Sequence, residues 1–184
     1  MVGEELMRII AGSAKGRTIA APPSGTRPMT GRVRESLFSI IAGHLVDADV
    51  LDLYAGSGGL GLEALSRGAR SAVFVERSSR ASRVIAENVD AVGLGGTVHQ
   101  GPAYDVVGRL RGRFDVVFVD PPYRDSDESV ENLLARLDGL LADTGIVVVH
   151  RQASSALTPP DFLTCIDERR YGDAVVSMFE RPTS

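Results

Sequence analysis

The chain has 184 residues, a net charge of −4, 43% hydrophobic residues and 24% charged residues, a composition typical of one soluble globular domain. No apolar run approaches the roughly 18 residues needed to span a bilayer, and the first ten residues lack a signal-peptide pattern. We therefore expect a cytoplasmic protein without a membrane partner. A single cysteine excludes an internal disulfide, and we expect Cys165 to lie in the core. The histidines share no short ligand spacing, so we predict no metal site.

The net charge conceals a basic N-terminal segment. The first 34 residues carry a net charge of +4, and the other 150 carry −8. Lys15 is the only lysine, against 19 arginines. Because arginine presents a planar fork of donors to phosphate, this segment favours a polyanionic partner such as nucleic acid. Charge alone leaves a solvated basic surface as the alternative.

The N-terminal segment predicts a short β-hairpin, with strands at residues 7–12 and 17–21. An irregular connector rich in proline and glycine follows at residues 21–31. From Thr30, a candidate N-cap, apolar residues recur with helical spacing.

Beyond residue 50, apolar strands alternate with amphipathic helices. Strands are expected at 50–54, 71–76, 96–100, 115–120 and 145–150, and helices at 60–68, 78–92, 103–111 and 126–141. Segments 162–172 and 174–181, joined by Gly172-Asp173, predict an antiparallel hairpin. The expected fold class is α/β: a Rossmann-like, doubly wound, mostly parallel seven-stranded sheet with a C-terminal antiparallel hairpin and an N-terminal β-hairpin arm.

The first strand of the sheet runs into a glycine-rich loop, 52-DLYAGSGGLG-61. Gly56, Gly58 and Gly61 satisfy the pattern G-x-G-x-x-G between a strand and a helix, and Glu76 closes the next strand. This arrangement favours a cofactor that contains adenosine, with the acid on its ribose; the alternative is a purely structural tight turn. Asp52 would point a carboxylate at the loop, which suits a cofactor with a cationic end better than a diphosphate.

A second polar motif ends a buried strand, 113-RFDVVFVDPPYRD-125. Ligands of open α/β sheets bind at the carboxyl ends of the strands, so we expect Asp120 and Tyr123 beside the glycine loop. The alternative is a strand stop followed by a tyrosine that faces solvent.

Together these motifs resemble the Rossmann-like methyltransferases that use S-adenosyl-L-methionine (SAM) to modify exocyclic amino groups. The stretches 8-RIIAGSAKGRTI-19 and 27-RPMTGRVRESLF-38 extend the resemblance, over nearly the whole chain, to the RsmD family, which methylates guanine N2 in bacterial 16S ribosomal RNA. The resemblance implies SAM as cofactor and 16S rRNA as partner. It leaves open whether the rRNA is bound as free RNA or within a 30S particle. We expect the enzyme to be a monomer.

The resemblance also implies a cofactor site that runs from the amino-acid end of SAM through its ribose to its adenine. Its members would be Asp52, Tyr54, Gly56, Gly58, Glu76 and Arg77. Many relatives carry an acid for the adenine amino group where this chain has Pro102, so the backbone of Ala103 and Tyr104 would take that part.

The catalytic residues implied by the resemblance are Asp120, Pro121, Pro122 and Tyr123. A guanine N2 amine is a poor nucleophile because its lone pair is delocalised into the ring. Asp120 and the carbonyl of Pro121, held extended by Pro122, would accept hydrogen bonds from that amine and orient it. Tyr123 would stack on the base, and Asp120 would take the proton.

Residues 1–29 are expected to form an RNA-contacting arm and connector, and residues 30–184 the methyltransferase domain. The side chains expected to contact the RNA are Arg8, Lys15, Arg17, Arg27, Thr30, Arg32 and Arg34.

Two other functions stay open. An N6-adenine methyltransferase acting on DNA or RNA would share D-P-P-Y, but such enzymes usually carry a target-recognition region, for which the chain has no room after Tyr123. A non-catalytic RNA-binding assembly factor would show damage in D-P-P-Y or in the glycine loop, and both are intact.

Overall fold

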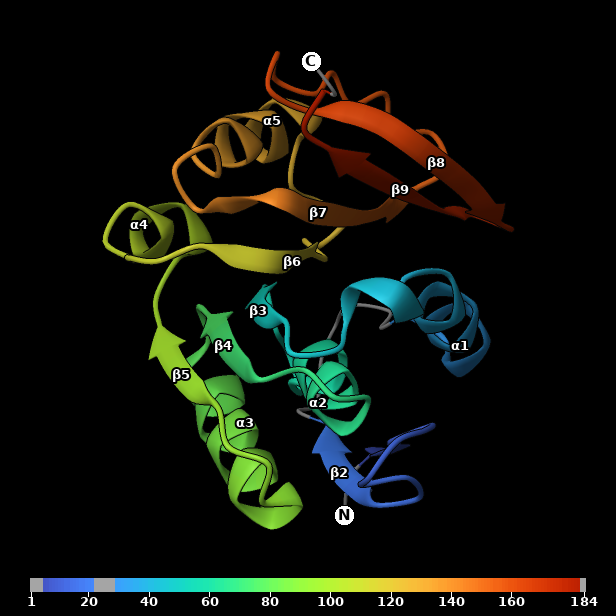
Figure 1. The fold of residues 1–184 in the computed structure, drawn as a ribbon, viewed down its shortest axis with the longest axis vertical. Coiled ribbons are helices and arrows are strands. Elements are labelled where there is room, and N and C mark those ends of the chain that lie inside the picture. The colour runs from blue at the N-terminus through green and yellow to red at the C-terminus, as the bar shows by residue number, and fades with distance from the viewer. Residues whose placement is uncertain (1–4, 22–28, 183–184) are drawn as a thin grey trace.

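The computed structural model describes residues 5–21 and 29–182, and its centre is a seven-stranded sheet of order β5-β4-β3-β6-β7-β9-β8 (Figure 1). The strands are β3 (Asp49–Leu53), β4 (Ser71–Glu76), β5 (Thr97–Gln100), β6 (Phe114–Val119), β7 (Leu141–Gln152), β8 (Thr164–Tyr171) and β9 (Ala174–Glu180). Strands β3 to β7 are parallel, and β9 runs antiparallel between β7 and β8. The predicted Rossmann-like sheet with a C-terminal antiparallel hairpin is therefore confirmed.

Helices cover both faces of the sheet. One face carries α1 (Gly31–Ile40), α2 (Gly59–Ser66) and α3 (Ser79–Val92), and the other carries α4 (Ala103–Val107) and α5 (Asp127–Ala135). Successive side chains of a strand point to opposite faces, so Val50 of β3 packs in the first core and Leu51 in the second, both fully buried. This burial on two sides explains why the strands are unbroken apolar runs.

Polar caps locate the starts of two helices where the sequence predicts them. The hydroxyl of Thr30 accepts a hydrogen bond from the Val33 amide at 3.4 Å and begins α1. The hydroxyl of Ser78 accepts one from the Ala81 amide at 3.3 Å and begins α3. Both caps satisfy amide groups that have no acceptor inside their helix.

The N-terminal hairpin, β1 (Glu5–Arg8) and β2 (Thr18–Ala21), lies beside α2 and α3 (Figure 1). It confirms the predicted hairpin, but its first strand ends at residue 8 instead of residue 12, because residues 9–12 already belong to the connecting loop. The carboxylate of Glu63, in α2, accepts hydrogen bonds from the amides of Ile10 and Ala11 at 2.7 and 3.0 Å. The loop that joins the two strands is thereby fixed to the body of the protein.

Asn88, in α3, fixes the second strand of this hairpin. Its side chain accepts from the Ala20 amide at 2.9 Å and donates to the Ala20 carbonyl at 2.8 Å. The same amide group donates to the carbonyl of Ser57, in the glycine loop, at 2.9 Å. One buried side chain therefore joins the hairpin to that loop.

Two helices end several residues earlier than predicted. The structure ends α4 at Val107 instead of residue 111, and α5 at Ala135 instead of residue 141. After α5 the buried side chains of Leu137 and Leu141 continue the apolar spacing, but the chain turns between them and Leu141 already begins β7. The apolar spacing continues past the end of α5 because these leucines are buried in the core, and this is why the sequence predicted too long a helix.

The prediction that Cys165 lies in the core is wrong, because its side chain is exposed on β8. That strand is at the edge of the sheet, and the register shifts beside this residue, between Cys165 and Asp167. In residues 5–21 and 29–182, no group of three or more His, Cys, Asp or Glu side chains is placed to hold a metal ion. Across the same ranges, no helix is long and apolar enough to cross a membrane.

Candidate active site

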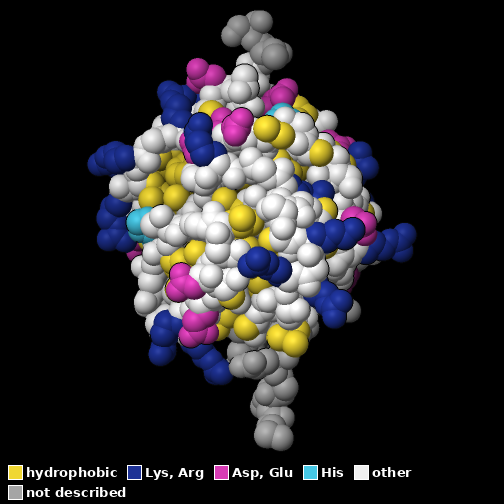
Figure 2. All heavy atoms as spheres, turned by 60° about the horizontal axis from the view of Figure 1, so that its bottom comes forward, with side chains coloured by type: hydrophobic (Ala, Val, Ile, Leu, Met, Phe, Trp, Pro, Cys, Tyr) yellow, Lys and Arg dark blue, Asp and Glu magenta, His cyan; other side chains and the backbone are white. Residues whose placement is uncertain are grey.

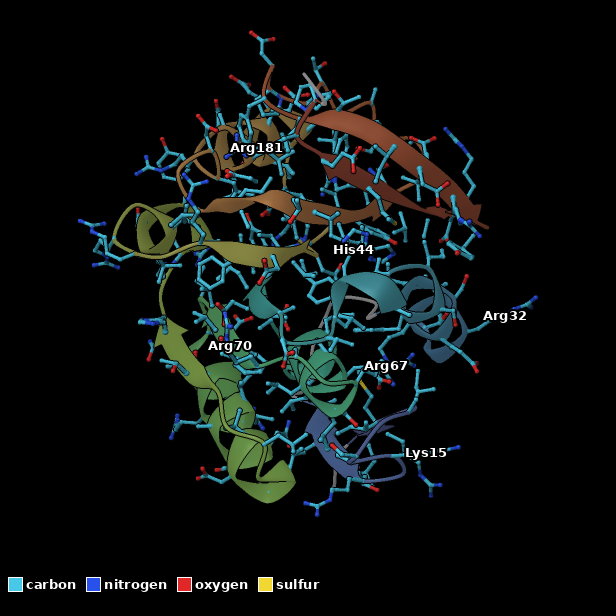
Figure 3. The ribbon with its side chains drawn as sticks, in the orientation of Figure 1. Lys15, Arg32, His44, Arg67, Arg70 and Arg181 are labelled. Atoms are coloured by element: carbon cyan, nitrogen blue, oxygen red, sulfur yellow. The ribbon has the colours of Figure 1, made fainter. Side chains whose placement is uncertain are left out.

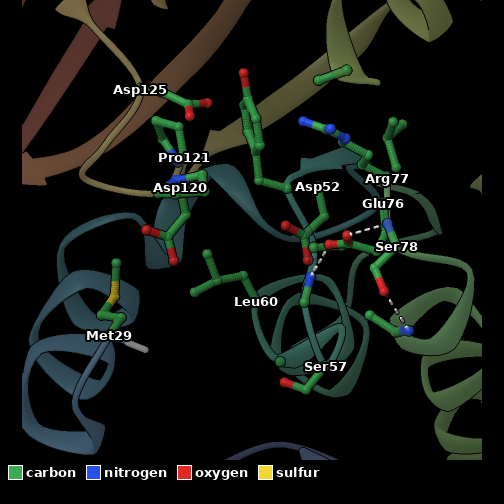
Figure 4. A pocket seen from close by; sticks show the side chains of 18 of the residues that line it. Met29, Asp52, Ser57, Leu60, Glu76, Arg77, Ser78, Asp120, Pro121 and Asp125 are labelled. Atoms are coloured by element: carbon green, nitrogen blue, oxygen red, sulfur yellow. Dashed lines mark hydrogen bonds between the residues drawn. The ribbon is translucent and has the colours of Figure 1, made fainter. Parts of the chain in front are cut away.

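A cavity of about 1000 Å³ lies at the carboxyl ends of β3, β4 and β6 (Figure 4). Parallel neighbours bring these ends to one edge, so motifs far apart in the chain meet here. The predicted residues that line the cavity are Asp52, Tyr54, Gly56, Glu76, Arg77, Ala103, Tyr104, Asp120, Pro121, Pro122, Tyr123 and Arg34. Gly58 is not among the lining residues. It caps α2 with a φ of 79°, and a Cβ there would lie 3.2 Å from Ile85.

The glycine loop reverses the chain sharply between β3 and α2. Tyr54, with a φ of 61°, and Gly56, with a φ of 58°, both adopt the left-handed conformation, which is uncommon for a residue other than glycine. At position 61 glycine is needed for packing instead, because a Cβ there would lie 2.4 Å from the ring of Phe74. The loop thus curves tightly at the cavity while α2 lies close against β4.

The carboxylate of Glu76 connects this loop to the start of α3. One oxygen accepts from the Gly56 amide at 2.9 Å and the other from the Ser78 amide at 2.7 Å (Figure 4). Each carboxylate oxygen has a second lone pair, so the side chain can still accept hydrogen bonds from a ligand in the cavity.

Asp52 is a buried acid at the end of β3, only 1% exposed, that accepts a hydrogen bond from the Gly61 amide at 2.9 Å. In Figure 4, Asp52 and Asp120 project into the cavity on either side of Leu60. Burial raises the pKa of Asp52 well above its usual value, and the negative charges of Asp120 and Glu76 raise it further. A cationic ligand would relieve this repulsion, so this wall of the cavity suits positive charge.

Asp120 has a partner that the sequence did not reveal. The Nδ1 of His150 lies 2.7 Å from Oδ1 of Asp120, and because a carboxylate accepts, Nδ1 is the donor. The rings of His150 and Tyr123 have centroids 6.0 Å apart. The sequence shows only that each of the two apolar runs ends in a polar residue, and it is the register of β6 on β7, which pairs Val119 with Val149, that brings Asp120 and His150 together.

Arg151, the next residue of β7, holds the loop that follows Asp120. It is 2% exposed and donates to the carbonyls of Pro122 at 3.2 Å and Asp125 at 2.6 Å, and to the carboxylate of Asp127 at 3.1 Å. The hydroxyl of Ser155, above all, lowers the pKa of Asp127. This fixed loop presents the D-P-P-Y residues to the cavity.

The predicted RNA-contacting residues fall into different environments. Lys15 and Arg32 are exposed and extend away from the body (Figure 3). Arg17 instead donates to the carbonyls of Ala91 and Val92 at 3.0 and 2.9 Å, so it ties the hairpin to the end of α3. The other members of the set are Arg8, exposed on β1; Thr30, the cap of α1; Arg34, buried at the cavity; and Arg27, outside the described residues.

The basic side chains of the described residues do not form one continuous patch on the lower face of the molecule. In Figure 2, lysine and arginine side chains are spread over this face with acidic side chains among them. This face therefore shows no large area of positive charge alone. A polyanion that bound here would contact individual arginine and lysine side chains.

Comparisons with known proteins agree with the fold and the motifs. The family model described as "Conserved hypothetical protein 95" matches residues 7–180. The chain is 36% identical to "Ribosomal RNA small subunit methyltransferase D" of Escherichia coli (strain K12), over 97% of this chain and 92% of that one. It is 34% identical to "Putative rRNA methyltransferase YlbH" of Bacillus subtilis (strain 168), over 95% and 99%.

A solved structure, "Putative methyltransferase yhhF from Escherichia coli", superposes with a TM-score of 0.88 and 34% identity, over 96% of this chain and 98% of that one. The similarity therefore covers the N-terminal hairpin, the cavity and the C-terminal strands alike. The chain belongs to the Conserved hypothetical protein 95 family, which is the RsmD family that its motifs indicate.

Proposed function

We propose that the protein transfers a methyl group from SAM to the exocyclic N2 of a guanine in 16S rRNA of the small ribosomal subunit. The observation that carries this proposal is the position of Asp120. Its carboxylate, oriented by His150, lines the same cavity as the glycine loop and Asp52. The family relatives named as small-subunit rRNA methyltransferases support the choice of substrate.

The residues of the cavity fit SAM, whose sulfonium carries the methyl group that the reaction transfers. Asp52 is buried beside two other acids, so a bound cation would stabilise its charged form, and the ammonium of the cofactor is such a cation. Glu76 keeps lone pairs for the ribose hydroxyls. Arg77, Ala103 and Tyr104 also line the cavity and would enclose the adenine.

Asp120 and Tyr123 would hold the target base. The oxygen of Asp120 that does not contact His150 would accept a hydrogen bond from the guanine amine and orient its nitrogen toward the methyl group, and this alignment would supply most of the acceleration. As the nitrogen gains its bond to the methyl carbon, the bond from that carbon to the sulfonium breaks and its electron pair returns to sulfur. Asp120 would stabilise the positive charge that develops on the nitrogen and accept the proton that leaves it. The Pro121 carbonyl is the second acceptor for the amine, and the ring of Tyr123 stacks on the unpaired base.

Incubation of the protein with radiolabelled SAM and either rRNA or DNA tests this function. We expect label in N2-methylguanine of small-subunit rRNA. Label in N6-methyladenine would identify an adenine methyltransferase instead, and absence of label from every nucleic acid, with RNA binding intact, would indicate a non-catalytic assembly factor.

The substitution His150→Ala is expected to lower kcat about tenfold, because Asp120 loses the donor that orients it. The Michaelis constant for SAM should stay unchanged. His150→Asn, which keeps a donor near the position of Nδ1, should restore most of kcat. Equal loss in both variants, together with lower melting temperatures, would show that the histidine only supports packing.

Lys15 and Arg32 are proposed as contacts to RNA phosphates. The double variant Lys15→Glu/Arg32→Glu is expected to bind rRNA about tenfold more weakly at moderate salt and to show a shallower dependence of affinity on salt. The matched control is Arg109→Glu/Arg111→Glu, which reverses two exposed charges after α4, on the opposite face of the sheet from α1. Equal losses in the two double variants, measured by filter binding, would rule out a specific contact.

A further inference from the structure

Asn88, in α3, uses its whole side-chain amide to join two segments that are far apart in the chain. It is 4% exposed, and its oxygen accepts a hydrogen bond from the Ala20 amide at 2.9 Å. Its nitrogen donates to the carbonyls of Ala20 at 2.8 Å and of Ser57 at 2.9 Å. A carboxamide has two N–H donors, and both are engaged here. A shift of β2 or of the glycine loop therefore disturbs the bond of Asn88 to the other segment.

The glycine loop depends on such outside contacts for its shape. Tyr54, with a φ of 61°, is left-handed, and a conformation of this kind persists only when the surrounding structure enforces it. Glu76 holds the Gly56 amide, and Asn88 holds the carbonyl of the next residue, Ser57. Ser57 lines the cavity, whereas Asn88 is not among the lining residues. Asn88 therefore fixes the loop from outside the cavity.

The N-terminal hairpin also depends on the body of the protein for its order. It forms a two-stranded sheet, and a two-stranded ribbon is marginally stable on its own in water. Met7 of β1 and Ala21 of β2 line the cavity. Lys15, a proposed RNA contact, lies in the loop that joins the same two strands. The hairpin thus extends from the wall of the cavity to the proposed RNA-binding surface.

We propose that Asn88 is a positioning residue that couples the cofactor to the RNA: SAM bound at the glycine loop orders the hairpin, and the ordered hairpin binds rRNA more tightly. The inference rests on the proposed function for the identity of both ligands. When one side chain holds two segments, a ligand that rigidifies one of them leaves less conformational entropy for the second ligand to remove. Linkage makes the effect mutual, so rRNA strengthens SAM binding by the same factor.

Amide hydrogen exchange of the wild-type protein, with and without saturating SAM and without RNA, tests the coupling before any variant is made. The reporters are the amides of Ile9 and Gly16, which bond across the hairpin to the carbonyls of Arg17 and Ile9 at 3.0 and 2.9 Å and lie outside the cavity lining. We expect SAM to slow their exchange about fivefold or more beyond any slowing in β8, at the far edge of the sheet. Unchanged exchange of both reporters in a protein that binds SAM would overturn the proposal.

The variant Asn88→Ala assigns this response to one residue, because alanine bonds to neither segment. SAM should still bind, but it should slow exchange in the hairpin less than about twofold. The matched control is Arg17→Met, which frees the hairpin from the carbonyls of Ala91 and Val92 but leaves the bond to Ser57 intact. The control should keep the wild-type response. If Asn88 only stabilised the fold, its loss would speed exchange equally with and without SAM, and this outcome would overturn the proposal.

Filter binding of an rRNA fragment measures the consequence for RNA. S-adenosylhomocysteine, which SAM becomes when it loses its methyl group, replaces SAM in this experiment to prevent turnover. Saturating S-adenosylhomocysteine should tighten RNA binding about fivefold or more in the wild type and in Arg17→Met, and less than about twofold in Asn88→Ala. Any direct contact between the cofactor and the target base persists in the variant, so the difference isolates the part that Asn88 carries.

The remaining outcomes separate this proposal from its neighbours. Loss of the response in Arg17→Met as well as in Asn88→Ala would overturn the assignment to Asn88, since any loosening of the hairpin would then suffice. An equal gain in RNA affinity for the wild type and Asn88→Ala would also overturn it. A wild-type protein that does not bind SAM would contradict the proposed function itself. If Asn88→Ala shows no cooperative melting transition, the wild-type exchange and the variant Asn88→Ser, which keeps a polar group but is too short to bond both segments, decide.

Discussion

The substitution Asp120→Asn is expected to reduce kcat for methyl transfer by about 10²- to 10⁴-fold, the range typical of a lost general base. An amide keeps the shape of the side chain but turns one acceptor into a donor and cannot take a proton at the end of the reaction. Affinity for SAM should stay within about threefold, because the proposed mechanism has Asp120 contact the target amine and not the cofactor's charged groups. Single-turnover kinetics with rRNA and calorimetry with SAM measure the two quantities.

The matched control for this experiment is Asp143→Asn, which removes an exposed acid of β7 whose side chain is 89% exposed. It should leave kcat and SAM affinity unchanged. An Asp120→Asn enzyme that retains wild-type kcat would contradict the assignment of Asp120 as the group that orients the amine and accepts its proton.

The substitution Asp52→Asn is expected to weaken SAM binding by about tenfold or more and, at the same time, to stabilise the protein without ligand at neutral pH. Burial raises the pKa of Asp52, so the folded state binds its proton more tightly than the unfolded state does. Stability from this group is therefore lost as the pH rises from the usual carboxyl pKa, near 4, toward the raised folded value. Asparagine can still accept from the Gly61 amide but carries no charge to bury.

Thermal unfolding between about pH 4 and about pH 8, without SAM, measures this difference. The gap in melting temperature, variant above wild type, should widen with pH and should reverse when SAM is saturating, because only the wild type gains full binding energy. A gap that does not change with pH would contradict the raised pKa, and equal SAM affinities would contradict contact with the cofactor.

Local sequence patterns predicted the elements that depend on local chemistry. Strand β4 was located to the residue at 71–76, α1 begins directly after the predicted cap Thr30, and α3 begins one residue after its predicted start at Ser78. These features follow from alternation, burial on two sides and side-chain capping, all of which leave marks in neighbouring residues. The glycine loop and Asp120 could be brought together because parallel strands share a carboxyl edge.

The contacts that support the site could not be predicted in the same way. The bond from His150 to Asp120 depends on the register between β6 and β7, and the contacts of Arg151 depend on the path of the loop after Pro122. Arg17 was assigned to RNA from its charge, whereas the structure shows its guanidinium on the carbonyls that end α3. Each of these contacts joins segments far apart in the chain, so no local pattern records them.

Mass mapping of small-subunit rRNA, from cells with the protein and from cells that lack it, tests the central claim most directly. The account predicts that one N2-methylguanine disappears from the 16S rRNA of the deficient cells and returns when the wild-type chain, but not the Asp120→Asn chain, is restored. An unchanged set of N2-methylguanines, or loss of a methyl group from adenine instead, would contradict it.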